Sequence, residues 1–200
     1  MSLRLKDGIT LYFSRHGETE ANRERRFSGR HDTPLTDKGR EQARAVGEIL
    51  EHQVGMRPAL AFISSPLRRA CVTMEIVRET LGLPGNGYAT DPRIEEIDLG
   101  RWDELTDAEA RALDPALFDA RHADKWHIHV PGGENYSEVA IRATHWVQSL
   151  NADTFAVSHG ALTRILRGLF QGLPWQGMSE LDEPQGVVFR VQGRTVTRLD

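Results

Sequence analysis

Two stretches of the sequence end in the same way: residues 9–17 read ITLYFSRHG, and residues 154–160 read TFAVSHG. In each, an apolar run rich in β-branched and aromatic residues stops at a histidine that is followed by glycine. Such runs are typical of buried strands, and the glycine marks a sharp turn after the strand. Ligands bind at the ends of strands in open α/β sheets. We therefore expect His16 and His159 to meet at one sheet edge as a candidate catalytic pair.

Strand-like and helix-like runs alternate along the rest of the chain. We expect strands at Ile9–Ser14, Ala59–Ser64 and Thr154–Ser158, and a terminal hairpin of Val187–Val191 with Thr195–Leu199. We expect helices that begin near Thr36, Pro66 and Ser137, a helix at Leu162–Phe170, and short helices near Asp107–Leu113 and Pro115–Arg121. This alternation predicts an α/β fold with a largely parallel sheet.

The helix expected from Pro66 carries the only cysteine of the chain. Its apolar stripe passes through Ala70, Cys71, Met74 and Val77, so we expect a buried thiol rather than a reactive one. A single cysteine excludes an internal disulfide and is typical of a reducing compartment. No basic-then-apolar leader opens the sequence, so we expect no secretory signal and a cytoplasmic location.

The composition is that of an ordinary globular protein. The chain has 200 residues, of which 39% are hydrophobic and 27% charged, and we expect residues 1–200 to form a single domain. Its net charge of −4 argues against nucleic-acid and membrane-surface partners, because both favour a basic face. The longest apolar runs are too short to cross a bilayer. The section from about residue 93 to 136 lacks periodicity, and we expect an irregular, lid-like insertion there.

Two arginine-bearing stretches indicate anion binding. The positive charge of Arg15 lowers the pKa of the adjacent His16. A lowered pKa would help a histidine that acts as a nucleophile, because only the neutral ring attacks. The alternative is an Arg-His pair on the surface with no role in catalysis. Arg68 and Arg69 stand in the first turn of the predicted helix, where each cation costs a few tenths to about 1 kcal/mol against the helix dipole. An anion at the helix start would reverse that balance, whereas two exposed arginines would simply tolerate it. Four further arginines share one loop, which is either an anion site or a solvated basic run: Arg23, Arg25, Arg26 and Arg30.

Five motifs, in order, are similar to those of the histidine phosphatase superfamily, the phosphoglycerate mutase-like group. They are Arg15-His16-Gly17-Glu18 with Asn22 and Phe27-Ser28-Gly29, then SPLRRA (65–70), EIDLGRW (96–102), PGGE (131–134) and Ser158-His159-Gly160. A lone Arg-His-Gly would be weak evidence, but five motifs in the family's order over residues 10–160 are specific. The resemblance implies a three-layer sandwich with a mostly parallel central sheet and helices on both faces.

The resemblance also implies catalytic roles for five residues. His16 is expected to be the nucleophile that forms a phosphohistidine, and Glu96, rather than Glu95, the general acid. Arg15, Arg69 and His159 are expected to bind the phosphoryl oxygens. We favour Arg69 over its neighbour because the family places its arginine directly before the small residue, here Ala70.

Further residues are expected to contact the substrate, and no metal or other cofactor is expected. The substrate-binding set is Asn22, Ser28, Gly29, Arg68 and Gly160, with Arg68 either a rim residue or a substrate contact. Fixed cationic donors stabilise the charge that spreads over the equatorial oxygens in phosphoryl transfer, so the scheme requires no metal. Burial of Glu96 beside Leu99 and Trp102 would raise the pKa of its carboxyl group, and the arginines would oppose that rise.

Three histidines of the irregular section are candidate metal ligands. His127 and His129 alternate as on one face of a strand, and His122 lies nearby. No cysteine pair or His-Glu-x-x-His pattern accompanies them, so surface or pocket-lining histidines are the better interpretation. In the family this region covers the substrate, so His127, His129, Trp126 and Tyr136 are candidates for setting substrate choice.

Two positions depart from the family pattern. After Trp102, many phosphatases of the group carry an acidic residue and then glycine, whereas this chain has Asp103-Glu104. After Glu134, a small hydroxyl residue is common, whereas this chain has Asn135-Tyr136. Neither departure removes a catalytic group, so both bear on the substrate.

Three functions compete. The first is a phosphatase that hydrolyses a small phosphomonoester, and the second is a cofactor-dependent phosphoglycerate mutase. The third is a non-catalytic phosphate-binding module. Mutases that resemble this family carry a longer insertion between the acid and the second histidine, which here lie 63 positions apart (96 to 159). A shorter cover admits water and favours hydrolysis. The substrate is not specified by the motifs, and both a monomer and a homodimer paired through the terminal hairpin fit the sequence.

Overall fold

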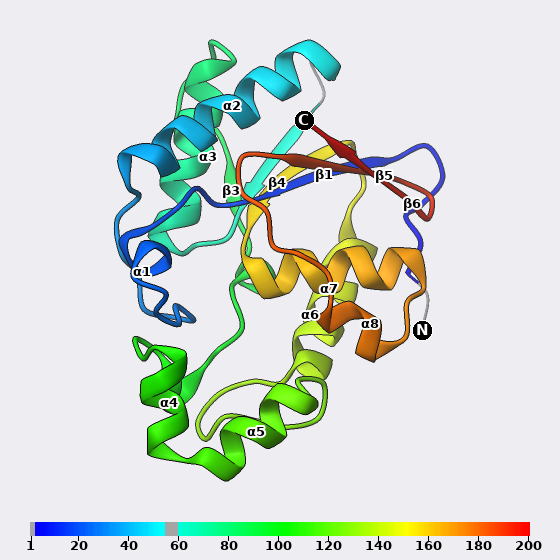
Figure 1. The fold of residues 1–200 in the computed structure, drawn as a ribbon. Helices are drawn as coiled ribbons and strands as arrows, with labels where there is room; N and C mark the ends of the chain where they lie inside the picture. Colours follow the sequence, from blue (N-terminus) through cyan, green and yellow to red (C-terminus); the bar gives the residue numbers. More distant parts are fainter. Residues whose placement is uncertain (1–2, 55–59) are drawn as a thin grey trace.

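A six-stranded sheet forms the centre of the computed structural model, which describes residues 3–54 and 60–200 (Figure 1). The strand order is β3-β2-β4-β1-β5-β6, in which β1, β2, β3 and β4 pair in parallel and β5 and β6 are antiparallel. The strands are β1 (Thr10–Arg15), β2 (Ala61–Ser64), β3 (Ala89–Thr90), β4 (Thr154–Ser158), β5 (Val188–Gln192) and β6 (Thr195–Leu199). The predicted α/β class with a mostly parallel sheet is confirmed.

Helices cover both faces of this sheet, with α2 and α3 on one face and α6 and α7 on the other. The α-helices of the described residues are α1 (Glu20–Arg23), α2 (Asp37–Gln53), α3 (Arg68–Thr80), α4 (Asp107–Leu113), α5 (Pro115–Ala123), α6 (Tyr136–Ser149), α7 (Gly160–Gln171) and α8 (Trp175–Ser179). Successive side chains of a strand point to opposite faces, so Leu11 and Phe13 of β1 join one apolar cluster with α6 and α7. Tyr12 joins a second cluster with α2 and α3. Two cores separated by the sheet make the predicted three-layer sandwich.

Most predicted elements are present with small shifts in their ends. The helix predicted to begin near Thr36 is α2, and the Thr36 hydroxyl caps it by accepting a hydrogen bond from the backbone N–H of Gly39 at 3.0 Å. The strand predicted from Ala59 begins at Ala61, and Ala59 itself lies outside the described residues. The predicted helix from Pro66 begins at Arg68, and Cys71 on it is buried as expected. The short elements α1, β3 and α8 were not predicted, because four, two and five residues carry too little periodicity.

The irregular section, residues 93–136, is called segment 93–136 below. It contains α4 and α5, the 3₁₀ turn Gly100–Trp102 and part of the 3₁₀ turn Pro92–Ile94. A third apolar cluster lies within it, centred on Trp102, Ala110 and Val130, with Phe27 and Phe118 packed against it. Figure 1 shows α4 and α5 set apart from the sheet, beyond the end of α6. Across the described residues, no helix is long and apolar enough to span a membrane.

Candidate active site

The register of β1 with β4 brings the two motif histidines together. Arg15 pairs with Ser158, and the backbone N–H of His16 donates to the carbonyl oxygen of Ser158 at 2.9 Å. The imidazole rings lie 5.1 Å apart, centroid to centroid, and both side chains are buried. Two parallel strands that end side by side therefore deliver both rings to one sheet edge, as the sequence predicted.

The surroundings of His16 favour its neutral form. Burial lowers the pKa of the ring well below its usual value, and the guanidinium groups of Arg69 and Arg15 lower it further. The Nδ1 atom lies 2.8 Å from the carbonyl oxygen of Gly17, an acceptor only, so in the neutral ring Nδ1 carries the proton. The lone pair is then on Nε2, and a neutral nitrogen with a free lone pair can act as a nucleophile.

His159 is also held neutral, with one ring nitrogen occupied. Burial lowers the pKa of its ring well below the usual value, and the positive charge of Arg69 lowers it further. Its Nε2 lies 2.7 Å from the hydroxyl oxygen of Ser65. Its Nδ1 is buried and has no hydrogen-bond partner within the part of the chain that the structure describes. When Ser65 donates to Nε2, the Nδ1–H group is left as a donor for a bound molecule.

Arg69 is fixed by the protein itself. Its Nη1 donates to the Asp32 carboxylate at 2.8 Å, and the same carboxylate accepts the backbone N–H groups of Arg68 and Arg69 at 2.5 and 3.3 Å. The predicted anion at this helix start is therefore Asp32, not an open site for a bound molecule. A carboxylate there offsets the cost of two arginines at the positive end of the helix dipole.

The other nitrogens of Arg69 are largely occupied as well. The Nη atoms donate to the carbonyl oxygens of Ser28, Gly29 and His31, and Nε alone lacks a partner among the residues described. Adjacent positions on a helix face about 100° apart, so Arg68 points elsewhere and forms an exposed ion pair with Glu75 at 2.9 Å. The suggested contact of Arg68 with the substrate is not supported by this position.

Asp103, the acidic residue that follows Trp102 as in the family pattern, holds the loop that surrounds Arg69. Its carboxylate accepts the backbone N–H groups of Gly29, Arg30 and His31 at 2.7–2.8 Å. The next residue, Glu104, has φ +69°, a left-handed conformation that favours glycine. Glu104, the departure from the family's glycine, thus holds a left-handed conformation at a cost of about 1 kcal/mol.

Glu96 is buried beside the histidine pair. One carboxylate oxygen accepts the backbone N–H of Ile97 at 3.0 Å, and the other accepts that of Ala161, in the first turn of α7, at 3.4 Å. Burial raises the pKa of Glu96, and the nearby Glu183 carboxylate raises it further, while Arg69 and Arg15 oppose the rise. The predicted cause, desolvation against the arginines, is confirmed. A carboxyl group with a raised pKa can donate a proton near neutral pH.

A salt-bridged arginine secures the backbone around Glu96. Arg142 on α6 donates to the carbonyl oxygens of Arg93, Glu95 and Glu96 at 2.8–3.0 Å. It also forms a two-pronged ion pair with Glu134, at 2.9 and 3.0 Å. The Glu134 carboxylate also accepts the backbone N–H of Asp98 at 2.9 Å and lies 3.8 Å from Arg30, which gives this residue of the fourth motif a structural role. We call Arg142 with Glu134 the Arg142 clamp.

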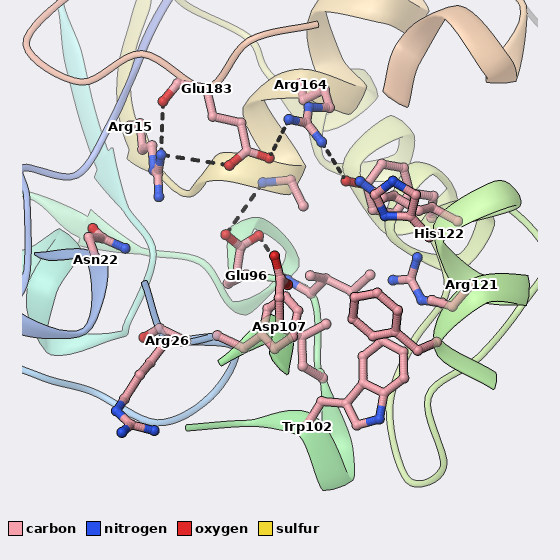
Figure 2. A pocket seen from close by; sticks show the side chains of 18 of the residues that line it. Arg15, Asn22, Arg26, Glu96, Trp102, Asp107, Arg121, His122, Arg164 and Glu183 are labelled. Atoms are coloured by element: carbon pink, nitrogen blue, oxygen red, sulfur yellow. Dashed lines mark hydrogen bonds and ion pairs between the residues drawn. The ribbon is translucent and has the colours of Figure 1, made fainter. Parts of the chain in front are cut away.

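A cavity of about 360 Å³ opens at this sheet edge (Figure 2). Of the residues predicted from the motifs, it is lined by Arg15, His16, Asn22, Ser28 and Glu96. Four of the others are buried and do not line the cavity: Arg69, His159, Gly29 and Gly160. A Cβ on Gly160 would lie 2.4 Å from a carboxylate oxygen of Glu183, so a larger residue there would require that side chain to move. A Cβ on Gly29 would lie 2.8 Å from the backbone carbonyl oxygen of Ile97 and 2.9 Å from the backbone nitrogen of Leu99, neither of which is free to move.

The sequence analysis did not identify Glu183 and Arg164, which line the cavity and form an ion pair with each other. Arg15 donates to the carbonyl oxygen of Glu183 at 2.8 Å, and Arg164 pairs with the Glu183 carboxylate at 3.1 Å and with the hydroxyl of Tyr136 at 3.1 Å (Figure 2). Arg164 has a sequence signal, a charge about one turn after His159-Gly160 on a largely apolar helix. Glu183 has none, since it belongs to an acidic loop that resembles any solvated surface.

The three histidines of segment 93–136 lie in different surroundings. His122 lines the cavity and stacks on Phe118, with centroids 6.1 Å apart. His127 is exposed and bonded to Asp124 at 2.8 Å, and His129 is exposed beside Gly133 and Asn135. Among the described residues, no three His, Cys, Asp or Glu side chains are grouped to hold a metal ion. Of the four residues named for substrate choice, only Tyr136 lines the cavity; His127, His129 and Trp126 do not.

Comparison with known proteins identifies the family. The model of the histidine phosphatase superfamily (branch 1) matches residues 11–195. The chain belongs to the histidine phosphatase superfamily. It is therefore an enzyme of the histidine phosphatase type, as the five motifs predicted.

Relatives within the superfamily carry different names. A glucosyl-3-phosphoglycerate phosphatase of Mycolicibacterium vanbaalenii is 35% identical, over 82% of this chain and 75% of the relative. A probable phosphoglycerate mutase GpmB of an Enterobacter species is 34% identical, over 96% of this chain and 85% of the relative. The structure of Bacillus stearothermophilus YhfR matches with a TM-score of 0.81 and 34% identity over 95% of each chain.

Proposed function

We propose that this protein is a metal-independent phosphatase that hydrolyses a small phosphomonoester through a phosphohistidine on His16. The observation that carries the proposal is the buried, neutral His16, whose Nδ1 is bonded to the Gly17 carbonyl, so that the Nε2 lone pair is available for attack. Attack of Nε2 on phosphorus forms the N–P bond as the bond to the alcohol oxygen breaks. Water then attacks the phosphohistidine and releases inorganic phosphate.

Fixed donors around His16 would hold the phosphoryl group. Arg15 lines the cavity, Arg69 has one unpartnered nitrogen among the described residues, Nε, and His159 has a buried Nδ1 in the same condition. Such preorganised donors stabilise the charge on the equatorial oxygens without reorganising during the reaction. Asn22, which also lines the cavity, is fixed by hydrogen bonds from the Thr19 backbone N–H and the Gln185 side chain, and would help place the substrate.

Glu96 would serve as the general acid and then as the general base. Burial raises the pKa of its carboxyl group, which favours the protonated form that the leaving alcohol needs. After it has protonated the leaving oxygen, the carboxylate is positioned to remove a proton from the attacking water. No step of this sequence requires a metal ion.

Phosphoglycerate mutase activity is the second candidate, because several relatives are named probable phosphoglycerate mutases. A mutase returns the phosphoryl group from histidine to a bound acid and must exclude water while doing so. Segment 93–136 is short for that task in comparison with the mutase pattern, which supports hydrolysis. Isomerisation of 3-phosphoglycerate stimulated by bisphosphoglycerate would favour the mutase.

The test of the proposal is hydrolysis of p-nitrophenyl phosphate in the presence of a chelator. We expect the wild type to turn over, and His16→Ala to lose activity by about 10³-fold or more, as enzymes do when they lose their nucleophile. His145→Ala is the matched control, because His145 is exposed on α6 and remote from the cavity lining. Loss of turnover with the chelator, or retention of activity in His16→Ala, would contradict the proposal.

A further inference from the structure

One side of the cavity carries cations that the proposed chemistry does not use. Arg121 on α5, Lys125 just beyond it and Arg164 on α7 all line the cavity. In Figure 2, Arg121 and His122 lie across the cavity from Arg15 and Asn22. The phosphoryl group would bind beside Arg15 and His16, so these cations face the part of a substrate that is not cleaved.

Arg121 is a buried cation without an anionic partner. Only 5% of the residue is exposed, and its guanidinium forms no hydrogen bond or ion pair within the described ranges 3–54 and 60–200. Its one specific contact is with the ring of Tyr136, with Cζ 5.6 Å from the centroid. A buried charge is costly unless it is paired, and a cation–π contact offsets only part of that cost.

Lys125 lies four residues after Arg121 and is also unpaired among the described residues. Burial and the positive charge of Arg164 lower the pKa of its ammonium group, the Glu183 carboxylate opposes that change, and Arg121 adds to it. Arg164 itself is paired with Glu183 and Tyr136, which leaves the other two as the free donors of this group. An anion bound between Arg121 and Lys125 would satisfy both.

The charge of the whole cavity points the same way. The cations lining it are Arg15, Arg26, Arg121, Lys125 and Arg164, and the acids are Glu96, Asp107 and Glu183. Glu183 is shared between Arg15 and Arg164, and Arg26 pairs outside with Glu109 at 2.9 Å. The cations thus outnumber the acids, and the excess is on the Arg121 side.

We propose that Arg121 and Lys125 form a second anion subsite, so that the substrate is a phosphomonoester bearing a carboxylate or a second phosphate on its uncleaved part. This inference rests on the proposed function, since it assigns the scissile phosphate to the His16 end. Guanidinium binds both carboxylate and phosphate in a two-pronged geometry, so the two anions share one recognition chemistry.

Three esters of similar size separate these chemistries. Glycerol 3-phosphate has no second anion, 3-phosphoglycerate has a carboxylate, and propane-1,3-diol bisphosphate has a second phosphate. We expect the wild type to prefer at least one of the latter two over glycerol 3-phosphate by about tenfold or more in kcat/KM. In Arg121→Met, which keeps an apolar stem against Tyr136, that ratio should fall by about tenfold, toward one, and in Lys125→Met by less.

The matched control is Arg111→Met in the same segment. Arg111 also stacks on an aromatic ring, that of Phe118 at 5.9 Å, but it is exposed and paired with Asp119, and does not line the cavity. Its substitution should leave the ratio unchanged. A ratio near one in the wild type, or the same ratio in Arg121→Met as in the wild type, would overturn the subsite.

A binding measurement separates failure of the subsite from failure of the proposed function. Calorimetric titration of His16→Ala with 3-phosphoglycerate, propane-1,3-diol bisphosphate and glycerol 3-phosphate requires no turnover. Tighter binding of a doubly anionic ester, lost when Arg121→Met is added, supports the subsite even if the wild type hydrolyses nothing. If the wild type hydrolyses these esters and affinity is indifferent to Arg121, the subsite is wrong and the phosphatase proposal stands.

Discussion

The two sides of the candidate active site are held in different ways. His16 and His159 stand at the ends of β1 and β4, where the backbone pairing of the strands sets their positions. Glu96 belongs to segment 93–136, where no regular strand or helix holds it, and the Arg142 clamp fixes its backbone through side-chain contacts. The proposed nucleophile is therefore positioned by the fold, whereas the proposed acid is positioned by a few side chains.

This difference has a consequence for sensitivity to substitution. A side-chain change near β1 or β4 leaves the ladder of backbone hydrogen bonds intact, so the histidines stay in place. A change at Arg142 removes several hydrogen bonds from the acid's backbone at once. The predictions below test both halves, from the largest expected effect to the smallest.

Glu96→Gln should give the largest effect in segment 93–136. Removal of a general acid typically costs about 10²–10⁴-fold in rate, so we expect that loss with an alkyl phosphate and a smaller one with p-nitrophenyl phosphate, whose leaving group needs little protonation. Because burial raises the pKa of Glu96, wild-type activity on the alkyl ester should fall as pH rises through that pKa. The variant should lack this alkaline limb.

The neighbouring acid supplies the control for that experiment. Glu95 is ion-paired with Arg30 and does not line the cavity, so Glu95→Gln should keep the alkaline limb. An alkaline limb that persists in Glu96→Gln and disappears in Glu95→Gln would move the acid to the other residue.

Arg142→Met should lower kcat by about 10- to 100-fold, with a smaller change in KM, because the acid is misplaced while the phosphate donors stay. Arg142→Lys, which keeps the charge, should restore part of kcat. Steady-state kinetics with an alkyl phosphate measures both. The control is Arg101→Met, an exposed arginine of the same segment. A rise in KM at unchanged kcat would show that Arg142 does not position Glu96.

The sequence predicted the first half of this comparison better than the second. Alternating apolar patterns end at His16 and His159, so strand ends alone place the two rings together. The same local logic predicted the helix that begins near Thr36 and the short helix at Asp107–Leu113. These features depend on residues close in sequence, which is why a pattern is enough to find them.

Contacts between distant residues were not predictable in this way. Asp32 accepts backbone N–H groups from a helix that starts 36 positions later, whereas the sequence left only a bound anion or two exposed arginines as alternatives there. Arg68, expected as either a rim residue or a substrate contact, is turned by the helix toward Glu75. Glu183 and the Arg142 clamp act across the fold, and no local periodicity marks them.

The buried histidines should make stability depend on pH. Their pKa values are lowered in the folded protein, so below about pH 6.5 the unfolded chain binds protons that the folded chain does not. The free energy of unfolding should therefore fall as pH decreases from 6.5, by about 1.4 kcal/mol per pH unit for each histidine, until the lowered pKa is reached.

Urea unfolding at pH 7 and pH 5.5 tests this prediction. The double variant His16→Asn with His159→Asn should lose less stability on acidification than the wild type. The exposed His145→Asn should behave like the wild type. Equal losses in the double variant and the wild type would show that the rings are not neutral in the fold.

Thr106→Ala should give the smallest effect. The Thr106 hydroxyl accepts the backbone N–H of Glu109 at 3.2 Å, and the Glu109 carboxylate accepts that of Thr106 at 2.8 Å. Loss of this cap should destabilise α4 by about 1 kcal/mol. Amide hydrogen exchange should accelerate in α4 and stay unchanged in β1 and β4. Exchange that accelerates equally in the strands would show that segment 93–136 and the sheet do not differ in stability; Thr195→Ala, exposed on β6, is the control.

The most direct test of the central claim is a rapid acid-free quench during turnover, followed by peptide mapping of the bound phosphoryl group. The account predicts an acid-labile phosphoryl group on the peptide that contains His16, absent in His16→Ala and accumulating in Glu96→Gln. Turnover with no phosphoenzyme, or with the phosphoryl group on any residue other than His16, would contradict it.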